Sequence, residues 1–446
     1  MKALVIGKSQ GMKKQPKVLV ISRDSWNDTN NSGNTLSNLF QNWDAENIAN
    51  IYCRDEIPNN KICSDYFKIS ESLLLKKLLR KAPVAGIKVQ RQEAALAISE
   101  VKDEQNEKKI YDFFRKNRFH IFLWGRELLW KIVNWKSKEL KDFIKDFNPD
   151  VIYSPSYDSF YMHDILKFVQ KESSVKVVYF HCDDLVTYRQ YSWSPLYWIN
   201  RYVLRKHMDK SIRLAAKNYC IIDEQSRVYK KIYNLDFDIL YKTGDFTNFP
   251  QTHSPNVPLK LIYTGNIIYG RIHSLFSIAD ALKKINSDGI KAKLYLYTAN
   301  EITPEVRHRL ESSGSVEIMG KVPYSQISGI LNNGDILVHV ESFEKQQMLA
   351  TSLSFSTKIV DYLEAGKPIF AMGWKEAASI KYLHDNGIGV TANNNQEVLG
   401  KLKDLINHTE SLNDKGLKAW EFGKEKHNKK DVLKNFEDNL EALKKD

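Results

Sequence analysis

Hydrophobic positions recur along the first half of the chain as short apolar runs, each followed by small or polar residues and then by helical spacing. The first run covers residues 17–22, KVLVIS, and further runs cover 48–53, 150–154, 175–181, 218–222 and 238–241. The runs are apolar on both faces, and helical patterns separate them. This alternation predicts a parallel β-sheet covered by helices.

The same alternation restarts after a break at residues 249–258, FPQTHSPNVP, whose three prolines indicate an exposed linker. Beyond the linker we predict a helix at 273–285 and a helical tail over 395–446. Strands are predicted at 259–264, 293–297, 316–319, 336–340, 368–371 and 389–391. The pattern therefore predicts an α/β fold with two Rossmann-like domains facing across a cleft, which the carboxyl ends of their strands would line.

The length of 446 residues suits two domains. We place the first, acceptor-side domain at 1–248 and the second, nucleotide-sugar-binding domain at 249–425. A final helix over 426–446 is expected to cross back to the first domain. Residues 1–16 fit either a dispensable extension or a strand of their own.

A long basic segment, residues 66–147, is predicted to form a helical insertion in the strand series of the first domain. Residues 66–145 carry 19 lysines and arginines against 10 acidic residues, out of a net charge of +12 for the whole chain. Within 72–82, an apolar stripe of Leu74, Leu75, Leu78 and Leu79 lies opposite basic residues, and Trp130 and Trp135 follow among lysines. Residues 188–206 again mix aromatic side chains with arginines.

Two interpretations of this segment stay open. Basic amphipathic helices with interfacial tryptophans are typical of enzymes that bind an anionic membrane surface. Alternatively, the leucines pack on their own domain and the charges are solvated. Nucleic acid is not indicated, because no recognised binding module accompanies the charge.

Other features narrow the class of protein. No apolar run approaches the roughly 20 residues needed to span a bilayer, and the first residues do not form a signal peptide. The four cysteines, at 53, 63, 182 and 220, show no CxxC spacing, so we expect reduced thiols and no structural metal. We therefore expect a cytoplasmic protein, peripheral on the inner face of the plasma membrane if the basic segment binds lipid.

The most informative segment is 341–373, ESFEKQQMLATSLSFSTKIVDYLEAGKPIFAMG. A Ser/Thr-rich turn precedes a helix that is predicted to start near Thr357, and such a helix start attracts anions through its free N–H groups and its dipole. Ser354 and Ser356 add hydroxyl groups and Lys358 adds a charge. Asp361, one turn further, could accept hydrogen bonds from ribose hydroxyls. The plain alternative is that Lys358 and Asp361 form only a helical ion pair.

The order S-T-K-x-x-D-Y-L-x-A-G-K-P-I resembles the donor-binding segment of GT-B glycosyltransferases, particularly those of family four. The resemblance implies that Asp361 binds ribose and that Ser356, Thr357 and Lys358 bind the diphosphate. Two positions depart from the family pattern: the ribose acid is Asp rather than Glu, and Leu353 stands where the family has a second acid. Glu341 or Glu344 could supply that carboxylate.

Two further segments of the second domain fit this resemblance. In 263–271, YTGNIIYGR, the turn at Gly265 and Asn266 would let the backbone approach a phosphate, and Arg271 would be a diphosphate cation. In 320–324, GKVPY, the backbone at Val322 would contact the nucleobase.

Candidates in the first domain have weaker support. In 30–34, NNSGN, Gly33 and Asn34 resemble the glycine loop on the acceptor side. His181, Asp183 and Asp184 follow a strand and are expected to face the cleft, with His181 contacting the donor sugar or the acceptor. A semi-buried structural histidine and an ordinary glycine turn are the plain alternatives. A Mg²⁺ role for the two aspartates is disfavoured, because GT-B enzymes generally need no such metal.

The resemblance to family four implies a retaining, metal-independent glycosyltransferase, in which Arg271 and Lys358 are placed to stabilise the leaving diphosphate. The donor would be a nucleotide diphosphate sugar, with UDP the expected carrier, and no other cofactor is implied. The acceptor would be a hydroxyl of a glycan or lipid-linked glycan in surface polysaccharide synthesis. A non-catalytic nucleotide-sugar-binding partner of a membrane glycosyltransferase and a sugar-nucleotide 2-epimerase are the alternatives.

Overall fold

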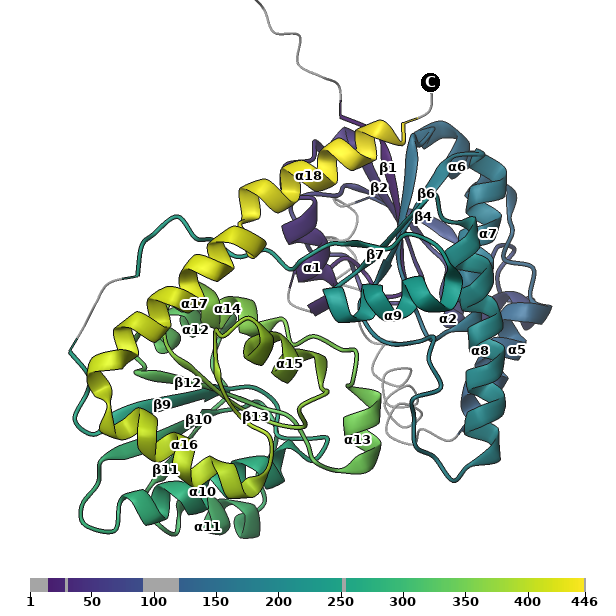
Figure 1. Cartoon of the computed structure of the whole chain (residues 1–446). Coiled ribbons are helices and arrows are strands. Elements are labelled where there is room, and N and C mark those ends of the chain that lie inside the picture. Colours follow the sequence, from purple (N-terminus) through teal and green to yellow (C-terminus); the bar gives the residue numbers. More distant parts are fainter. Residues whose placement is uncertain (1–14, 29–30, 91–119, 251–253, 445–446) are drawn as a thin grey trace, which may run out of the picture. The chain divides into compact units, whose positions relative to one another are not determined.

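The computed structural model describes residues 15–28, 31–90, 120–250 and 254–444 (Figure 1). They divide into two compact units. The first holds the described residues up to Tyr179, with Asp209–Ala216 and the residues from Glu437 onward, and the second holds Phe180–Met208 and Lys217–Phe436. The 1–248 and 249–425 boundaries expected from the sequence stay predictions.

The first sheet has eight strands in the order β4-β3-β2-β1-β5-β6-β7-β8. Strand β1 pairs in parallel with β2 and β5, and β4 joins β3 antiparallel. All five residues of β1 are buried, as a strand covered on both faces requires. The strands are β1 (Val18–Ser22), β2 (Ile48–Tyr52), β3 (Asp65–Lys68), β4 (Ile87–Gln90), β5 (Val151–Pro155), β6 (Lys176–His181), β7 (Lys217–Cys220) and β8 (Asp238–Ile239).

Six strands form the second sheet, in the order β11-β10-β9-β12-β13-β14. Every neighbouring pair is parallel, as the alternation of strands and helices predicts. The strands are β9 (Leu259–Thr264), β10 (Ala292–Tyr297), β11 (Val316–Gly320), β12 (Ile336–Val340), β13 (Ile369–Met372) and β14 (Val390–Ala392). Each lies within two residues of its predicted position.

Helices connect and cover the strands. Those that precede β9 are α1 (Asn31–Leu39), α2 (Glu71–Leu78), α5 (His120–Ile132), α6 (Lys138–Phe147), α7 (Phe160–Ser173), α8 (Pro195–Leu214) and α9 (Asp223–Tyr233). Those that follow it are α10 (Arg271–Ile285), α11 (Pro304–Glu311), α12 (Tyr324–Asn332), α13 (Lys345–Ala350), α14 (Lys358–Ala365), α15 (Ala378–Asp385), α16 (Asn395–Asn407), α17 (Leu412–His427) and α18 (Lys429–Ala442). The last three confirm the helical tail.

The core of the second unit shows why these residues form these elements. Leu261, Leu294, Val338 and Phe370, from four adjacent strands, are fully buried with Leu275 of α10. These residues form one continuous apolar face. Burying it stabilises the fold by about 25 cal/mol for each Å² of apolar surface removed from water. This packing fixes the strand ends from which the candidate site is built.

The segment 66–147 is only partly helical, contrary to the expectation of a helical insertion. Its described residues contain β3 and β4 as well as α2, α5 and α6, while 91–119 lie outside the described residues. Both tryptophans expected at a membrane interface are buried: Trp130 stacks on Tyr161, with ring centroids 4.1 Å apart, and Trp135 packs edge-on against Phe168. They are core residues, because α5 and the residues after it pack against α7.

Two sequence-based expectations concern thiols and membrane spans. The four cysteines are free, as expected. Within the described ranges, no helix combines the length and the apolar character needed to cross a bilayer.

Helix α1 begins at Asn31, so most of the NNSGN segment lies in the first helical turn rather than in a loop. A Cβ atom at Gly33 would stand 2.1 Å from the backbone oxygen of Asn27. This close approach requires a glycine at position 33, whatever its role in binding.

We expect Gly33→Ala to lower the free energy of unfolding by about 1–3 kcal/mol, because the backbone must move to admit the methyl group. Gly125→Ala is the matched control, since Gly125 lies in α5 with no atom near its missing Cβ. That change should be neutral or stabilise by up to about 1 kcal/mol. Urea denaturation measures both, and equal effects would contradict the steric explanation.

Candidate functional site

His181 ends strand β6 and is fully buried. Its Nε2 atom lies 3.3 Å from the side-chain oxygen of Asn218, and the rings of Tyr229 and Phe237 pack against it. Burial lowers its pKa to about 4, so the imidazole is neutral at pH 7. The expected contact with a sugar gains no support from this position, because the surrounding rings leave the imidazole no exposed surface.

The two aspartates after β6 differ in their surroundings. Asp184 is buried, accepts hydrogen bonds from the backbone N–H groups of Val186 and Thr187, and forms an ion pair with Arg201 at 3.7 Å. Its carboxylate therefore holds a turn, which does not support the expected acceptor role. Asp183 is exposed and accepts a hydrogen bond from the hydroxyl of Ser354 at 3.0 Å.

The remaining candidates of the first domain are Gly33 and Asn34 in α1. The side-chain oxygen of Asn34 accepts a hydrogen bond from Asn38 one turn later. The acceptor-side role of both residues stays a prediction.

Helix α14 begins at Lys358, with Thr357 as its N-cap, close to its predicted start. The first turn has no side-chain cap, but several of its N–H groups already have acceptors. The amide of Ser356 donates to the hydroxyl of Ser379, and the amide of Ile359 donates to the Ser356 carbonyl. Fewer N–H groups at this helix start can therefore donate to an anion than the sequence suggested.

Gly265 brings the end of β9 against the first residue of α14. A Cβ atom at Gly265 would stand 2.9 Å from the Lys358 ammonium and 2.9 Å from the Tyr263 hydroxyl. The side chain of Lys358 thus passes close over the Gly265 backbone. Two residues that are far apart in the sequence, Gly265 and Lys358, therefore lie close together.

Arg271 is the first residue of α10, and Gly270 before it has φ +73°. The Arg271 guanidinium donates to Glu341 Oε2 at 2.9 Å and to the side-chain oxygen of Asn266 at 2.8 Å. Glu341, directly after β12, also accepts from His339, whose Nε2 lies 3.1 Å from Oε1. Because both oxygens of this buried carboxylate have partners, Glu341 holds Arg271 in place and offers little surface to a sugar.

Electrostatics reinforce this pair. Burial alone would raise the pKa of Glu341, but His339 and Arg271 lower it overall. Burial alone would lower the pKa of Arg271, but the Glu341 carboxylate raises it overall. Both groups therefore stay ionised in the folded protein.

Asp361 lies one turn inside α14, and its carboxylate forms an ion pair with Lys242. The Lys242 ammonium also donates to the Thr357 carbonyl at 3.0 Å. No sequence motif marked Lys242, which lies 119 residues from Asp361. In this structure the expected ribose acid is thus neutralised by a lysine that a ligand would have to displace or share.

Asp361 lines a cavity of about 810 Å³ in the second unit. Tyr324, from the segment expected beside the nucleobase, lines the same cavity. Val322 is half-buried two residues earlier, after the left-handed Gly320 at φ +76°. The expected base and ribose regions therefore adjoin one another, whereas Glu344 is directed elsewhere, toward His273 at 3.4 Å.

Lys358 is the central cation of this group. Burial lowers its pKa first, and the nearby charge of Arg271 lowers it further, while Asp361 and Glu341 raise it. Lys358 has a lowered pKa, and Arg271 is paired with Glu341. In a partly dry site, two such cations would gain most from an anion that lies between them. The arrangement suits a diphosphate. Among the described residues, no group of three or more histidines, cysteines or acids could hold a metal ion.

Comparisons with known proteins identify the fold. No family model matches the chain, and no curated protein matches it in sequence. HepE from Anabaena, solved with UDP, has a TM-score of 0.62 at 12% identity and covers 96% of this chain and 100% of its own. A HepE structure with UDP-glucose gives 0.58 at 12%, covering 95% and 99%. WaaG, a glycosyltransferase involved in lipopolysaccharide biosynthesis, gives 0.53 at 12%, covering 95% and 99%. The GT-B fold expected from the sequence is confirmed.

The buried histidine of β6 leads to a pH prediction. An unfolded histidine binds a proton below about pH 6.5, whereas His181 in the folded chain resists protonation down to a pKa of about 4. Stability from this group is therefore complete above pH 6.5 and is lost as the pH falls toward 4. We expect His181→Phe to reduce the slope of unfolding free energy against pH in that range by up to about 1.4 kcal/mol per pH unit.

Urea denaturation from pH 7 to pH 4 would measure this slope. His308→Gln, an exposed position on α11, is the control and should leave it unchanged. Equal slopes in the wild type and in His181→Phe would show that His181 is solvated and able to titrate normally.

Proposed function

We propose that the chain is a glycosyltransferase that moves a sugar from a nucleotide diphosphate, with UDP the expected carrier, to a hydroxyl of a glycan or lipid-linked glycan. The observation that carries the proposal is the convergence of Lys358 and Arg271 beside Gly265, with Asp361 one helical turn away. Glycine at position 265 lets the Lys358 ammonium lie close against the backbone at the end of β9. Neighbours of the same fold were solved with UDP and UDP-glucose.

The chemistry follows from where charge develops. As the bond between the sugar and the diphosphate breaks, negative charge grows on the leaving phosphate. Lys358 and Arg271 would stabilise that charge, Arg271 from a position fixed by Glu341. Fixed cations cost no reorganisation during the reaction, so the proposal needs no metal ion. By the family resemblance, the sugar would be transferred with retention of configuration.

A ligand would also change the Lys242–Asp361 pair. Ribose hydroxyls can donate to the Asp361 carboxylate in place of the Lys242 ammonium. Donor binding would thus exchange one partner of Asp361 for another rather than fill a vacant acceptor.

Thermal stabilisation by UDP, GDP, CDP and ADP tests the donor site, because a ligand that binds the native state raises its stability. We expect one of these nucleotides, UDP first, to raise the melting temperature. Lys358→Gln should weaken its binding about tenfold or more through the loss of a charge-assisted hydrogen bond. No shift with any nucleotide, in a folded sample, would refute the proposed donor site.

A pair of variants separates a ribose contact from a merely structural ion pair. Asp361→Asn and Lys242→Met both break the contact between these two residues. If Asp361 binds ribose, only Asp361→Asn should weaken nucleotide binding. Equal losses in the two variants would mean that the pair acts only as a structural link. Sugar transfer from the bound donor then separates an enzyme from a non-catalytic nucleotide-sugar-binding partner.

Binding to an anionic membrane surface remains part of the proposal. It is assigned to exposed side chains of α2 and α5 instead of Trp130 and Trp135, which are buried. Of the predicted leucine stripe only Leu74 is buried, whereas Leu75, Leu78 and Leu79 are 47%, 50% and 62% exposed. Helix α5 lies beside α2 and exposes Leu123, Trp124, Leu128 and Ile132. Lys76, Arg80, Lys81 and Lys131 are exposed among these side chains. Apolar side chains surrounded by exposed lysines and arginines match an anionic bilayer surface.

We expect the protein to float with vesicles of phosphatidylglycerol and phosphatidylcholine at low salt, and the double change Leu78→Glu with Leu79→Glu to abolish flotation. Ile290→Glu is the control, because Ile290 is a similarly exposed aliphatic residue, at 52%, in the second unit. Flotation that is absent, or equally reduced by the control, would refute membrane docking through α2 and α5.

A further inference from the structure

Strand β10 departs from the burial that is usual for a parallel strand. Parallel strands are normally covered on both faces, and β12 follows this rule, because all five of its residues are buried. In β10, buried and half-buried residues alternate, so only one face is fully covered. Tyr295 and Tyr297 lie on the half-buried face, and Met319 of the neighbouring strand β11 is 45% exposed. Aromatic and apolar side chains therefore stand on an accessible face of the second sheet.

A cavity of about 380 Å³ lies between this face and α12. Its volume falls within the range of about 300–1,000 Å³ that small-molecule sites occupy. The apolar and aromatic side chains that line it are Ile262, Tyr295, Tyr297, Met319 and Ile330, and the polar ones are Lys260, Gln326 and Asn333. Apart from Asn333, none of these residues lines the cavity that Asp361 borders. The lining is therefore distinct from that of the candidate ribose region.

Gly329, inside α12, also lines this cavity. A glycine in a helix interior is unfavourable compared with alanine. A Cβ atom added at Gly329 would meet no atom within 4 Å, so no clash requires a glycine there. Gly334 differs, because its Cβ atom would stand 2.5 Å from the side chain of Ile262. The missing side chain at position 329 thus leaves open space at the cavity.

Lys260 gives the cavity a positive charge. Within the ranges that the structure describes, its ammonium makes no hydrogen bond or ion pair. Lys293, on the same face of the sheet, pairs with Glu317 at 2.7 Å, so these two charges balance. Asp335 accepts a hydrogen bond from the backbone N–H of Lys260, but its carboxylate is buried and does not line the cavity. The lining therefore carries one cation that a ligand could neutralise.

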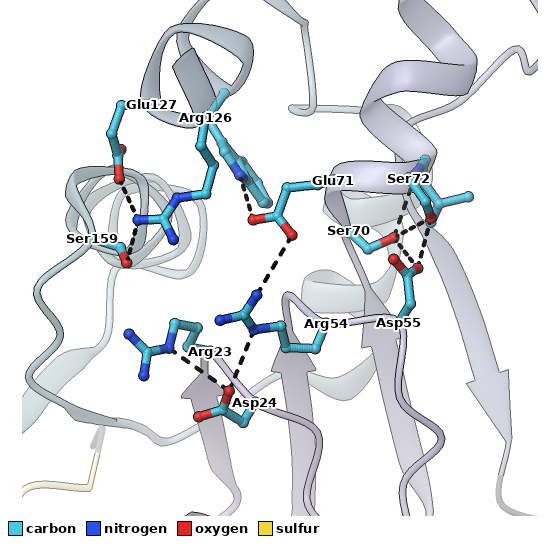
Figure 2. A network of polar contacts seen from close by, with 12 residues as sticks. Arg23, Asp24, Arg54, Asp55, Ser70, Glu71, Ser72, Arg126, Glu127 and Ser159 are labelled. Carbon is cyan, nitrogen blue, oxygen red and sulfur yellow. Dashed lines mark hydrogen bonds and ion pairs between the residues drawn. The ribbon is translucent and has the colours of Figure 1, made fainter. Parts of the chain in front are cut away.

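The charged side chains that follow β1 and β2 in the first unit show the opposite arrangement (Figure 2). Arg23 and Arg54 lie 3.8 and 3.4 Å from the carboxylate of Asp24. Asp158 lies 2.7 Å from Arg23 as well. An anion would have to compete with these carboxylates, whereas at Lys260 it would displace none.

The neutral polar groups of the lining indicate what else the ligand carries. In the described part of the chain, the side-chain amides of Gln326 and Asn333 and the hydroxyls of Tyr295 and Tyr297 make no hydrogen bond. Amides and hydroxyls both donate and accept, and so do the hydroxyls of a sugar. An aromatic acid would supply a carboxylate for Lys260 but few hydroxyls for the other groups. A sugar ring adds a face of C–H groups, which can pack on tyrosine carbons.

We infer that this cavity binds a sugar ring that carries a carboxylate. The carboxylate pairs with Lys260, the hydroxyls bond to Gln326 and Asn333, and the C–H face of the ring packs on Tyr295 and the apolar lining. That such a ring belongs to the acceptor glycan rests on the proposed function; the binding itself does not.

Ligand-detected NMR with the full chain tests this inference. The probes are the methyl glycosides of glucuronic and galacturonic acid and, for comparison, those of glucose and galactose. We expect at least one acidic glycoside to bind about tenfold more tightly than its neutral counterpart, because it gains a charge-assisted hydrogen bond. Lys260→Gln should remove this preference. Lys291→Gln, an exposed lysine of the same unit outside the lining, is the matched control and should keep it.

A second variant tests the cavity without changing its charge. Gly329→Leu places a side chain where the structure has open space, so it should abolish glycoside binding and leave the fold intact. Gly400→Leu is the matched control, because Gly400 lies in α16 and also has no atom near its missing Cβ. Glycoside binding that persists in Gly329→Leu would place the ligand outside the cavity and overturn the inference.

Other results would also overturn it: neither acidic glycoside binds, the neutral glycosides bind as tightly, or the preference survives in Lys260→Gln. Benzoate that binds as tightly as the acidic glycoside, or inorganic phosphate that displaces it, would show that the sugar ring is not recognised. A parallel titration with UDP separates this inference from the proposed function. UDP binding without glycoside binding would refute only the sugar cavity, and glycoside binding without UDP binding would refute only the donor site.

Discussion

The buried ion pair between Arg271 and Glu341 is the interaction on which the candidate donor site depends. It joins the start of α10 to the end of β12, and His339 and Asn266 satisfy the remaining polar atoms at 3.1 and 2.8 Å. Removing one partner of such a pair would leave an uncompensated buried charge, which typically costs about 3–5 kcal/mol. The pair therefore fixes the orientation of the Arg271 guanidinium and holds this second cation at a defined position near Lys358.

The charges of the candidate donor site are balanced within the fold by neighbouring groups or by burial. Lys242 neutralises Asp361, Glu341 neutralises Arg271, and burial lowers the pKa of Lys358. Each charge has a partner that a nucleotide diphosphate could replace or complement. In the proposed reaction these groups would be held in place before the substrate arrives, as electrostatic catalysis requires.

The charged groups at strand ends differ between the two units. Around Gly265 the described side chains supply more cations than carboxylates, which suits a diphosphate. At the ends of β1 and β2, Arg23 and Arg54 contact the three carboxylates of Asp24, Asp158 and Glu71, so negative groups outnumber positive ones there. Near α2 and α5 the exposed charges are basic and stand among leucines, which suits an anionic surface. One fold thus presents three chemically distinct surfaces.

The sequence by itself determined most of the strands, because buried parallel strands require continuous apolar runs. It also determined the start of α14 and the spacing of Lys358 and Asp361, because helical periodicity is local. Short strands such as β3 and β4 escaped prediction, since few residues carry their pattern. Only the tertiary structure decided which distant residues meet: Glu341 with Arg271, 70 positions apart, and Lys242 with Asp361, 119 apart. It also decided that His181 and Trp130 are buried, because burial depends on what packs against a residue, and no local pattern records that.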